Sequence, residues 1–145
     1  MTDAEKNSGT CPIDRGLTLI GDRWSMLVLR DIQRGFTRYD QIRTSLGIAP
    51  NILARRLAAL TAAGLLEKRR YNQRPPRDEY WLTEKGRDFL PILAAIGAWG
   101  CKHNGDGALT RQIDVETGEA IRPVVIDANT GAPLGTRELR LEYPT

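Results

Sequence analysis

Asn51 and Arg55 stand four positions apart within residues 48–66, a stretch that otherwise holds mostly small and apolar side chains. The asparagine amide and the arginine guanidinium are the groups that make paired hydrogen bonds to the edges of adenine and guanine. In a helix these two positions share one face, and small neighbouring side chains let such a face approach another surface closely. We therefore predict that Asn51 and Arg55 contact the bases of double-stranded DNA.

A helix over this stretch is indicated by its ends and by its apolar spacing. Pro50 suits a first helical turn, and Gly64 tolerates the backbone conformation found at a helix end. Leu53, Leu57 and Leu60 fall on one stripe, on the side opposite the two polar residues. The same pattern also fits an ordinary amphipathic helix with solvated arginines, so the neighbouring segments must decide between the two interpretations.

Three shorter helices are predicted before it, at residues 12–21, 22–35 and 38–46. Asp22 is a suitable N-cap for the second of these. A link of a few residues, 47–50, joins the third to the helix described above. Two short helices joined by a tight glycine-containing turn, with polar residues early in the second, are typical of a helix-turn-helix.

A basic hairpin is predicted directly after Gly64. Residues 65–71 and 78–83 can pair as strands, and the run between them is too rich in proline to be helical. A two-stranded basic hairpin in this position is a wing, although the same residues would also fit a solvated β-turn. Basic side chains here and on the nearby helices are predicted to contact the DNA backbone or minor groove, where they position a protein without specifying sequence. These are Arg38, Arg56, Arg69, Arg70, Arg74 and Arg77.

Thr83 is a suitable N-cap for the longest predicted helix, which runs to about residue 103. Its apolar stripe, which includes Ile92, Ile96 and Trp99, is wider than a domain of this size needs for its own core. A dimer interface explains the excess, and packing beneath the C-terminal segment is the alternative. Trp81, at the end of the hairpin, is predicted to lie in the core.

Beyond residue 103 the sequence changes to short strand-like runs, at 111–115, 119–127 and 137–143. Two turns separate them and share the pattern Asp-x-x-Thr-Gly, at 114–118 and 127–131. The predicted fold class is therefore mainly α with a small β-hairpin wing, plus a small C-terminal β appendage. The predicted parts are a disordered tail at 1–10, a winged helix-turn-helix DNA-binding and dimerisation domain at 11–103, and the β-rich appendage at 104–145.

The composition is ordinary for a soluble globular protein, with 41% hydrophobic and 27% charged residues. No apolar run approaches the roughly 18 residues that span a bilayer, and the polar N-terminus has no apolar signal segment. We therefore expect a cytoplasmic protein with no membrane partner. Residues 12–103 carry 16 Lys and Arg against 9 Asp and Glu, whereas residues 104–145 carry 4 against 7. The basic excess lies where a polyanion is predicted to bind, and the acidic appendage is not expected to touch DNA.

Residues that would make a catalytic motif are missing from the sequence. The chain has one histidine, His103, and contains no glycine-rich phosphate loop, no His-Glu-x-x-His and no nucleophile elbow. Cys11 and Cys101 lie far apart and share no metal-ligand spacing. We therefore predict neither an enzyme nor a metal site or cofactor. A winged helix that binds only protein partners is a further alternative, which the basic wing disfavours.

Several motifs occur together and in order: Cys-Pro at 11–12, Gly-Asp-Arg-Trp at 21–24, Gly-Phe-Thr-Arg-Tyr at 35–39, Ala-Pro-Asn at 49–51 and Pro-Pro-Arg at 75–77. Over residues 11–101 the chain resembles the HxlR family of bacterial winged helix-turn-helix transcription regulators, distant relatives of the MarR type. The resemblance implies a homodimer that places one recognition helix in each of two successive major grooves. It also implies that the first helix, with Ile13 and Leu17, forms the dimer interface together with the last long helix. Members repress or activate genes, and the family usually ends soon after that helix.

Cys11 matches the N-terminal cysteine through which several members of that family sense electrophiles or oxidants. It precedes a helix start, which favours the thiolate, and Arg15 lies one turn further on. We therefore predict a dimeric, sequence-specific DNA-binding regulator, a repressor, that uses Cys11 as a sensor. A buried, inert Cys11 is one alternative, and a non-covalent small-molecule effector bound near the dimer helices is another. Cys101 is expected to serve packing.

Overall fold

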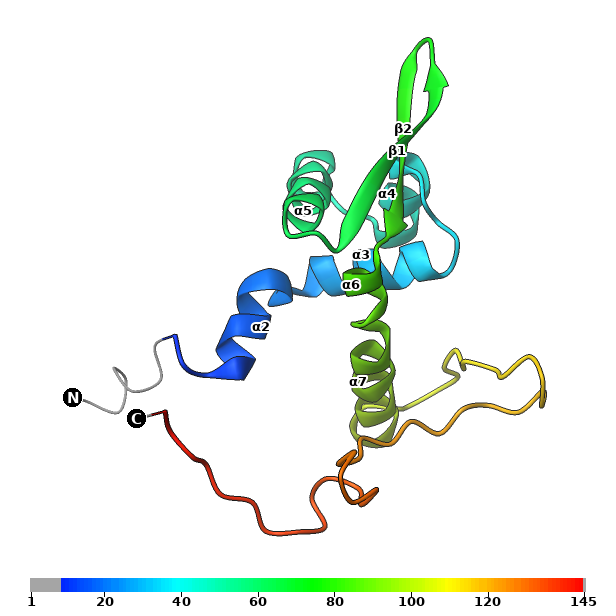
Figure 1. The fold of residues 1–145 in the computed structure, drawn as a ribbon. Helices are drawn as coiled ribbons and strands as arrows, with labels where there is room; N and C mark the ends of the chain where they lie inside the picture. Colours follow the sequence, from blue (N-terminus) through cyan, green and yellow to red (C-terminus); the bar gives the residue numbers. More distant parts are fainter. Residues whose placement is uncertain (1–8, 145) are drawn as a thin grey trace. The chain divides into compact units, whose positions relative to one another are not determined.

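The computed structural model describes residues 9–144, which divide into two compact units (Figure 1). The first unit holds the described residues up to Leu90 together with residues 143 and 144, and the second runs from Pro91 to Glu142. Of the predicted disordered tail, residues 1–8 lie outside the described residues, and Gly9 and Thr10 form a turn.

The first unit has the predicted order of short helices followed by a hairpin. Its elements are α2 (Pro12–Ile20), α3 (Arg23–Gln33), α4 (Tyr39–Leu46), α5 (Pro50–Ala62), β1 (Leu66–Gln73), β2 (Pro76–Leu82) and α6 (Glu84–Arg87). Figure 1 shows α4 and α5 on the same side of α3, with the hairpin reaching beyond both. This is a winged helix-turn-helix, mainly α with a small β wing, so the predicted fold class is confirmed here.

Local sequence explains where these helices start and end. Asp22 caps α3, because its side chain accepts a 2.9 Å hydrogen bond from the backbone N–H of Ser25. Gly47 ends α4 with a φ of 61°, a left-handed conformation that glycine adopts without a Cβ penalty. The link to α5 is therefore short, and Tyr39 reinforces it by donating a 2.8 Å hydrogen bond from its hydroxyl to the carbonyl oxygen of Pro50.

The core of the first unit lies where α3, α4, α5 and the base of the hairpin meet. Leu53, Leu57 and Leu60 are buried, as the predicted apolar stripe requires. They share the core with Val28, Leu29, Ile42, Ile48, Leu65 and Leu66. Burying one aliphatic side chain stabilises a fold by roughly 1.5–3 kcal/mol. The stripe therefore holds α5 against the unit and leaves its opposite face to solvent.

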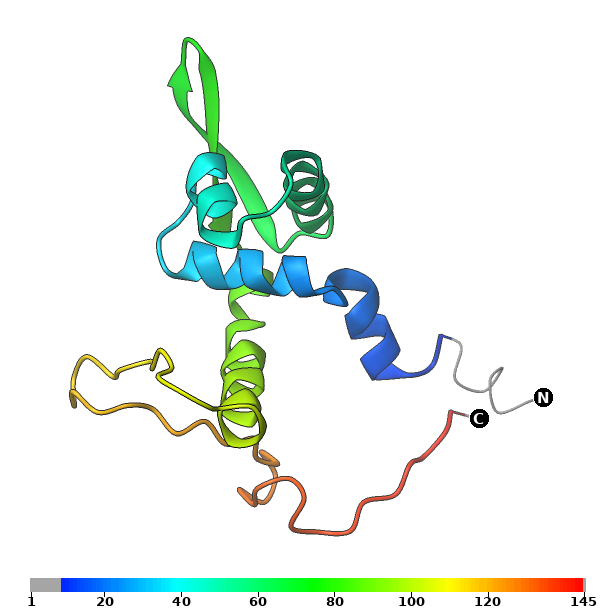
Figure 2. The same cartoon turned by 180° about the vertical axis from the view of Figure 1, so that it is seen from behind.

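The hairpin is antiparallel, with Leu66 opposite Leu82 at its base and Gln73 opposite Pro76 at its end. Along β1 only Leu66 is buried, so the rest of the strand gains nothing from the core. The far end of the hairpin projects away from the helices of this unit in both views (Figures 1 and 2). A ribbon that projects in this way is free to lie along another molecule.

The predicted helix from Thr83 to residue 103 is interrupted. α6 ends at Arg87, and a separate helix, α7 (Leu90–His103), lies in the second unit from Pro91 onward. Pro91 explains the break, because proline has no N–H to continue the hydrogen-bond ladder but fits the first turn of a new helix. The prediction of one continuous helix is therefore wrong, although the sequence contained the signal.

The rest of the second unit contains turns and no sheet. The strands predicted at 111–115, 119–127 and 137–143 are not formed in the part of the appendage that the structure describes. Isolated bridges join Ile113 to Ala120 and Ile126 to Pro133. The two similar turns are confirmed, because Asp114 and Asp127 each accept the backbone N–H two residues ahead, at 2.8 and 3.0 Å. A turn held by its own side chain forms locally, whereas a strand needs a partner strand along its length.

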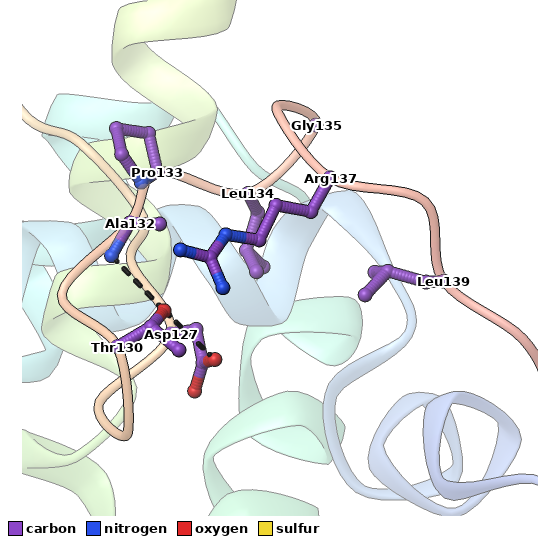
Figure 3. A pocket seen from close by; sticks show the side chains of 8 residues that line it. All are labelled: Asp127, Thr130, Ala132, Pro133, Leu134, Gly135, Arg137 and Leu139. Atoms are coloured by element: carbon purple, nitrogen blue, oxygen red, sulfur yellow. Dashed lines mark hydrogen bonds between the residues drawn. The ribbon is translucent and has the colours of Figure 1, made fainter.

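The second of these turns borders a small hollow (Figure 3). The hydroxyl of Thr130 donates a 3.0 Å hydrogen bond to the Asp127 carboxylate beside it, and the Arg137 side chain points towards them. The hollow has a volume of about 20 Å³, close to the space that one water molecule occupies. It is therefore too small to hold an organic effector.

Candidate nucleic-acid interface

Asn51 and Arg55 lie where the sequence predicts them, on the exposed face of the first half of α5. Ala58 and Ala62 are exposed and continue this face, so α5 itself places only small side chains there. Among the described residues, Arg55 has no carboxylate within ion-pair distance. Both polar groups are therefore available for hydrogen bonds to base edges.

Three of the arginines predicted to contact the DNA backbone are held by carboxylates of the wing. Arg38 lies 3.9 Å from Glu79, Arg70 lies 3.0 Å from Asp78, and Arg69 pairs with Glu67. Ion pairs between exposed side chains are weak, about 0–1 kcal/mol each. A phosphate group can therefore compete for these guanidinium groups.

The end of the wing has no such pairs. Arg74 and Arg77 flank its two prolines and are exposed, and neither forms an ion pair within the described part of the chain. The positive charge at this end of the hairpin is therefore uncompensated, and it lies away from the helices of the first unit (Figure 1).

Arg56, on the flank of α5, lies against the start of α3. Its Nε atom is 3.4 Å from Oδ1 of Asp22. Burial by itself raises the pKa of Asp22, but hydrogen bonds from the hydroxyl and backbone N–H of Ser25, with the charge of Arg56, hold it below its ordinary value. The carboxylate is therefore charged at neutral pH. No sequence pattern indicates this pair, because its members belong to different helices.

The end of α5 is held by residues that sequence reasoning missed. Lys85 donates a 2.7 Å hydrogen bond from its ammonium group to the carbonyl oxygen of Ala63. At Gly86, an added Cβ would lie 2.2 Å from the carbonyl oxygen of Leu65, so only glycine allows this close approach. The signal in the sequence was Gly86 itself, because neither a turn nor a helix end requires a glycine in the first turn of a predicted helix.

Trp81 is 39% exposed and lies on the surface of the wing, so the prediction that it is a core residue is wrong. Neighbouring side chains on a strand point to opposite faces, and Leu82 takes the more buried face at the base of the hairpin. The guanidinium of Arg69 lies 4.9 Å from the centre of the Trp81 ring. The exposed ring thus supports a cationic side chain of the wing through a cation–π contact.

Cys11 occupies the N-cap position of α2, is half-buried and is a free thiol. Arg15, one turn further on, donates a 2.7 Å hydrogen bond from Nε to the carbonyl oxygen of Gly9. Its charge therefore lies close to the backbone that precedes Cys11. Cys101 is also a free thiol, and it is exposed, in contrast to the packed position expected for it.

The residues predicted to form a dimer interface are all exposed in the described chain. On α2, Ile13 is 73% exposed, and Leu17 is also open to solvent. On α7, Trp99 is 67% exposed, with Ile92 and Ile96 exposed on the same helix. Exposed groups of large apolar side chains mark interaction sites, and each of these two helices carries such a group. These side chains are therefore free to pack against another molecule.

No cluster of three or more potential metal-ligating side chains occurs among residues 9–144. Within the same range, no helix is both long and apolar enough to span a bilayer.

Residues 19–107 match a known protein family, described as HxlR-like helix-turn-helix. The chain belongs to this family. The match includes the helix-turn-helix, the wing and α7, and it confirms the resemblance seen in the sequence. The HTH-type transcriptional regulator Rv3095 of Mycobacterium tuberculosis is 32% identical over 132 residues, which cover 90% of this chain and 84% of that protein.

Solved structures of other proteins agree with the HxlR-like assignment. PA1607, a candidate transcription factor, is 35% identical with a TM-score of 0.83, over 95% of this chain and 98% of its own. The redox regulator HypR in its reduced form is 31% identical with a TM-score of 0.60, over 64% of this chain and 93% of its own. This HxlR-like protein is therefore a transcription regulator with a helix-turn-helix DNA-binding domain, and it is not an enzyme.

Proposed function

We propose that the protein is a homodimeric, sequence-specific DNA-binding repressor in which α5 of each protomer enters a major groove. One observation carries the proposal: Asn51 and Arg55 are exposed on the first half of α5, and within the described chain nothing pairs with them. The N-terminal part of a recognition helix is the part that reaches the base edges. There the Asn51 amide pairs with adenine, and the Arg55 guanidinium pairs with guanine.

Wing and flanking arginines bind the phosphate backbone or the minor groove. Arg74 and Arg77 do so without giving up an ion pair with any residue from 9 to 144. Arg38, Arg69 and Arg70 exchange a wing carboxylate for a phosphate. Their contribution is smaller, because each released carboxylate remains nearby and repels the DNA. Arg56 belongs to the same predicted group, but its partner Asp22 comes from another helix.

Homodimerisation presents two recognition helices to two successive major grooves. The exposed apolar side chains of α2 and α7, Ile13 and Trp99 foremost, support an interface between two copies of the chain. Removing such surface from water contributes roughly 25 cal/mol per Å². A two-fold dimer of this kind binds an inverted repeat whose half-sites are about 10–10.5 base pairs apart, or a multiple of that spacing.

Cys11 acts as the sensor in this proposal. Its sulfur lies at the start of α2, one of the two proposed dimer helices, and the relative HypR is a redox regulator. An oxidant such as diamide takes two electrons and two protons from Cys11 and a cysteine of the other protomer, which leaves a disulfide between them. That bond changes the spacing of the two recognition helices and releases the operator.

A gel-shift assay on the DNA immediately upstream of the protein's own gene tests the proposal. Reduced protein is expected to bind tightly, diamide-treated protein to bind weakly, and dithiothreitol to restore binding. Cys11→Ser should bind as the wild type does and lose the response to diamide. Cys101→Ser shows whether the second thiol supplies the other half of the disulfide.

Two other outcomes would separate the DNA-binding function from the cysteine switch. Tight binding that diamide leaves unchanged would keep the DNA-binding function and replace the cysteine switch by a non-covalent ligand near the dimer helices. Failure to bind the upstream DNA or any sequence from a random pool at low salt would contradict sequence-specific binding itself.

A further inference from the structure

Asp22 and Arg56 join the start of α3 to the second turn of α5. The Nε atom of Arg56 lies 3.4 Å from Oδ1 of Asp22. The first turn of α3 already orients both carboxylate oxygens, because Oδ1 accepts the N–H of Ser25 at 2.9 Å and Oδ2 accepts its hydroxyl at 2.6 Å. Ser25 is buried, so the carboxylate is presented to Arg56 in a fixed position.

The Nε atom of Arg56 is shielded from solvent and has no hydrogen-bond partner among the described residues. A buried cationic N–H loses its hydration, and here the charge of Asp22 compensates for that loss. The contact is a charge attraction without hydrogen-bond geometry, so it depends on how close Arg56 stays to Asp22. Turning α5 about its axis would move Nε away from Oδ1 and leave the shielded Nε without the charge of Asp22, whereas Asp22 would keep its hydrogen bonds from Ser25.

The leucine stripe of α5 sets which face of the helix meets the core, and Arg56 lies on the flank of that face. The leucines fix α5 through close packing in the core, and the ion pair adds an electrostatic contact on the flank of the helix. Successive residues of a helix are about 100° apart, so a fixed direction for Arg56 also fixes the directions of Asn51 and Arg55. The ion pair therefore acts together with the leucine stripe to keep the face that carries Asn51 and Arg55 turned away from the core.

We propose that Arg56 is a positioning residue for DNA recognition, held by Asp22 so that Asn51 and Arg55 face the major groove. This inference rests on the proposed function, and it assigns Arg56 a role other than the phosphate contact predicted from the sequence. In this role Arg56 stabilises the rotational orientation of α5 about its axis and contacts no base.

Asp22→Asn distinguishes the two roles, because one predicts stronger DNA binding and the other predicts weaker binding to the operator. Asparagine caps a helix about as well as aspartate, so α3 keeps its first turn while the ion pair is lost. If Arg56 bound a phosphate, the substitution would remove a negative charge and free the guanidinium, and binding to all DNA would strengthen. If Arg56 positions α5, binding to the operator weakens and binding to unrelated DNA does not.

The test compares the full-length wild type with Asp22→Asn, Arg56→Gln and the double variant. An operator is selected from random DNA with the wild type, and affinities for it and for a shuffled sequence are measured over a range of salt concentrations. Each single variant should lower the ratio of the two affinities about tenfold, and the double variant should lower it no further. The salt slope should stay unchanged. Arg111→Gln, at an exposed position of the appendage, is the matched control.

Tighter binding of Asp22→Asn to both DNAs would overturn the proposal, and so would an equal loss on both DNAs with a smaller salt slope in Arg56→Gln. Thermal unfolding of the same four proteins tests the contact without DNA, because the double variant should lose less stability than the two single variants together. Additive losses would also overturn the proposal. A wild type that selects no sequence contradicts the proposed function alone, since the unfolding cycle still reports on the pair.

Discussion

The backbone N–H of Tyr80 donates a 2.7 Å hydrogen bond to the carbonyl oxygen of Thr37. The second wing strand is thereby attached to the residues that precede α4, and the hydroxyl of Thr37 adds a 3.4 Å contact with the carboxylate of Glu79. Burial, and then the negative charge of Asp78, raises the pKa of Tyr80, which remains a neutral phenol at this junction. The wing and the helix-turn-helix are therefore one structural piece.

Removing the charges at the end of the wing should weaken binding to every DNA sequence alike. For Arg74→Ala combined with Arg77→Ala, we expect the slope of log K against log salt to become shallower by about 0.9 for each lost phosphate contact. Fluorescence anisotropy with operator and shuffled DNA at several salt concentrations measures this. A loss confined to the operator would mean that the wing reads bases.

Arg55→Ala should reduce the discrimination between operator and shuffled DNA by roughly 1–3 kcal/mol, because a paired contact with guanine is removed. Competition binding with both DNAs measures the difference. Arg111→Ala removes the same side chain from an exposed position of the appendage and should have no effect. If Arg55→Ala kept the wild-type profile, base reading would have to be assigned to other residues of α5.

A charge placed in the proposed dimer interface should prevent association. Ile96→Lys and Trp99→Lys each bury an unpaired ammonium group if the dimer forms, and an unpaired buried charge is strongly destabilising. Sedimentation equilibrium should show monomers at concentrations where the wild type is dimeric, and operator binding should weaken in parallel. Val115→Lys, at a position that is 95% exposed, is the control. Variants that remain dimeric would exclude α7 from the interface.

Asp22 should make the stability of the protein depend on pH in acid. Its pKa is lowered from the ordinary 3.8 in the folded protein, so the unfolded chain takes up the proton first as the pH falls. Its stabilisation is therefore complete above the unfolded-state pKa and is lost as the pH falls through the folded-state pKa. Urea unfolding between about pH 5 and about pH 2 should show the advantage of the wild type over Asp22→Asn shrinking with acid. A difference that stays constant over this range would show that the pKa of Asp22 is not lowered on folding.

Local patterns predicted most of the first unit. Pro50, Gly47 and the leucines of α5 act within a few residues of one another, so their effects can be read without knowing the rest of the fold. The helix break at Pro91 could have been predicted in the same way, because the effect of proline on a helix is also local. The exposure of Trp81 could not be predicted in this way, because alternation along a strand does not say which face the rest of the molecule covers.

Strands in the appendage were predicted from residue composition, which does not show whether a partner strand lies beside each run. Asp114 and Asp127 form their turns with their own neighbours, and so the turns were predictable. A run such as 137–143 becomes a strand only if another strand lies beside it, and the described part of the second unit provides isolated bridges alone.

The sequence by itself determined that an amphipathic helix carries Asn51 and Arg55 on its polar face, because periodicity and helix ends depend on near neighbours. Only the tertiary structure showed which basic side chains form ion pairs with carboxylates of the same chain. Arg70 pairs with a carboxylate across the wing, and Arg56 pairs with Asp22 of another helix. The first pair depends on the register of the two wing strands, and the second on how α3 and α5 pack against each other.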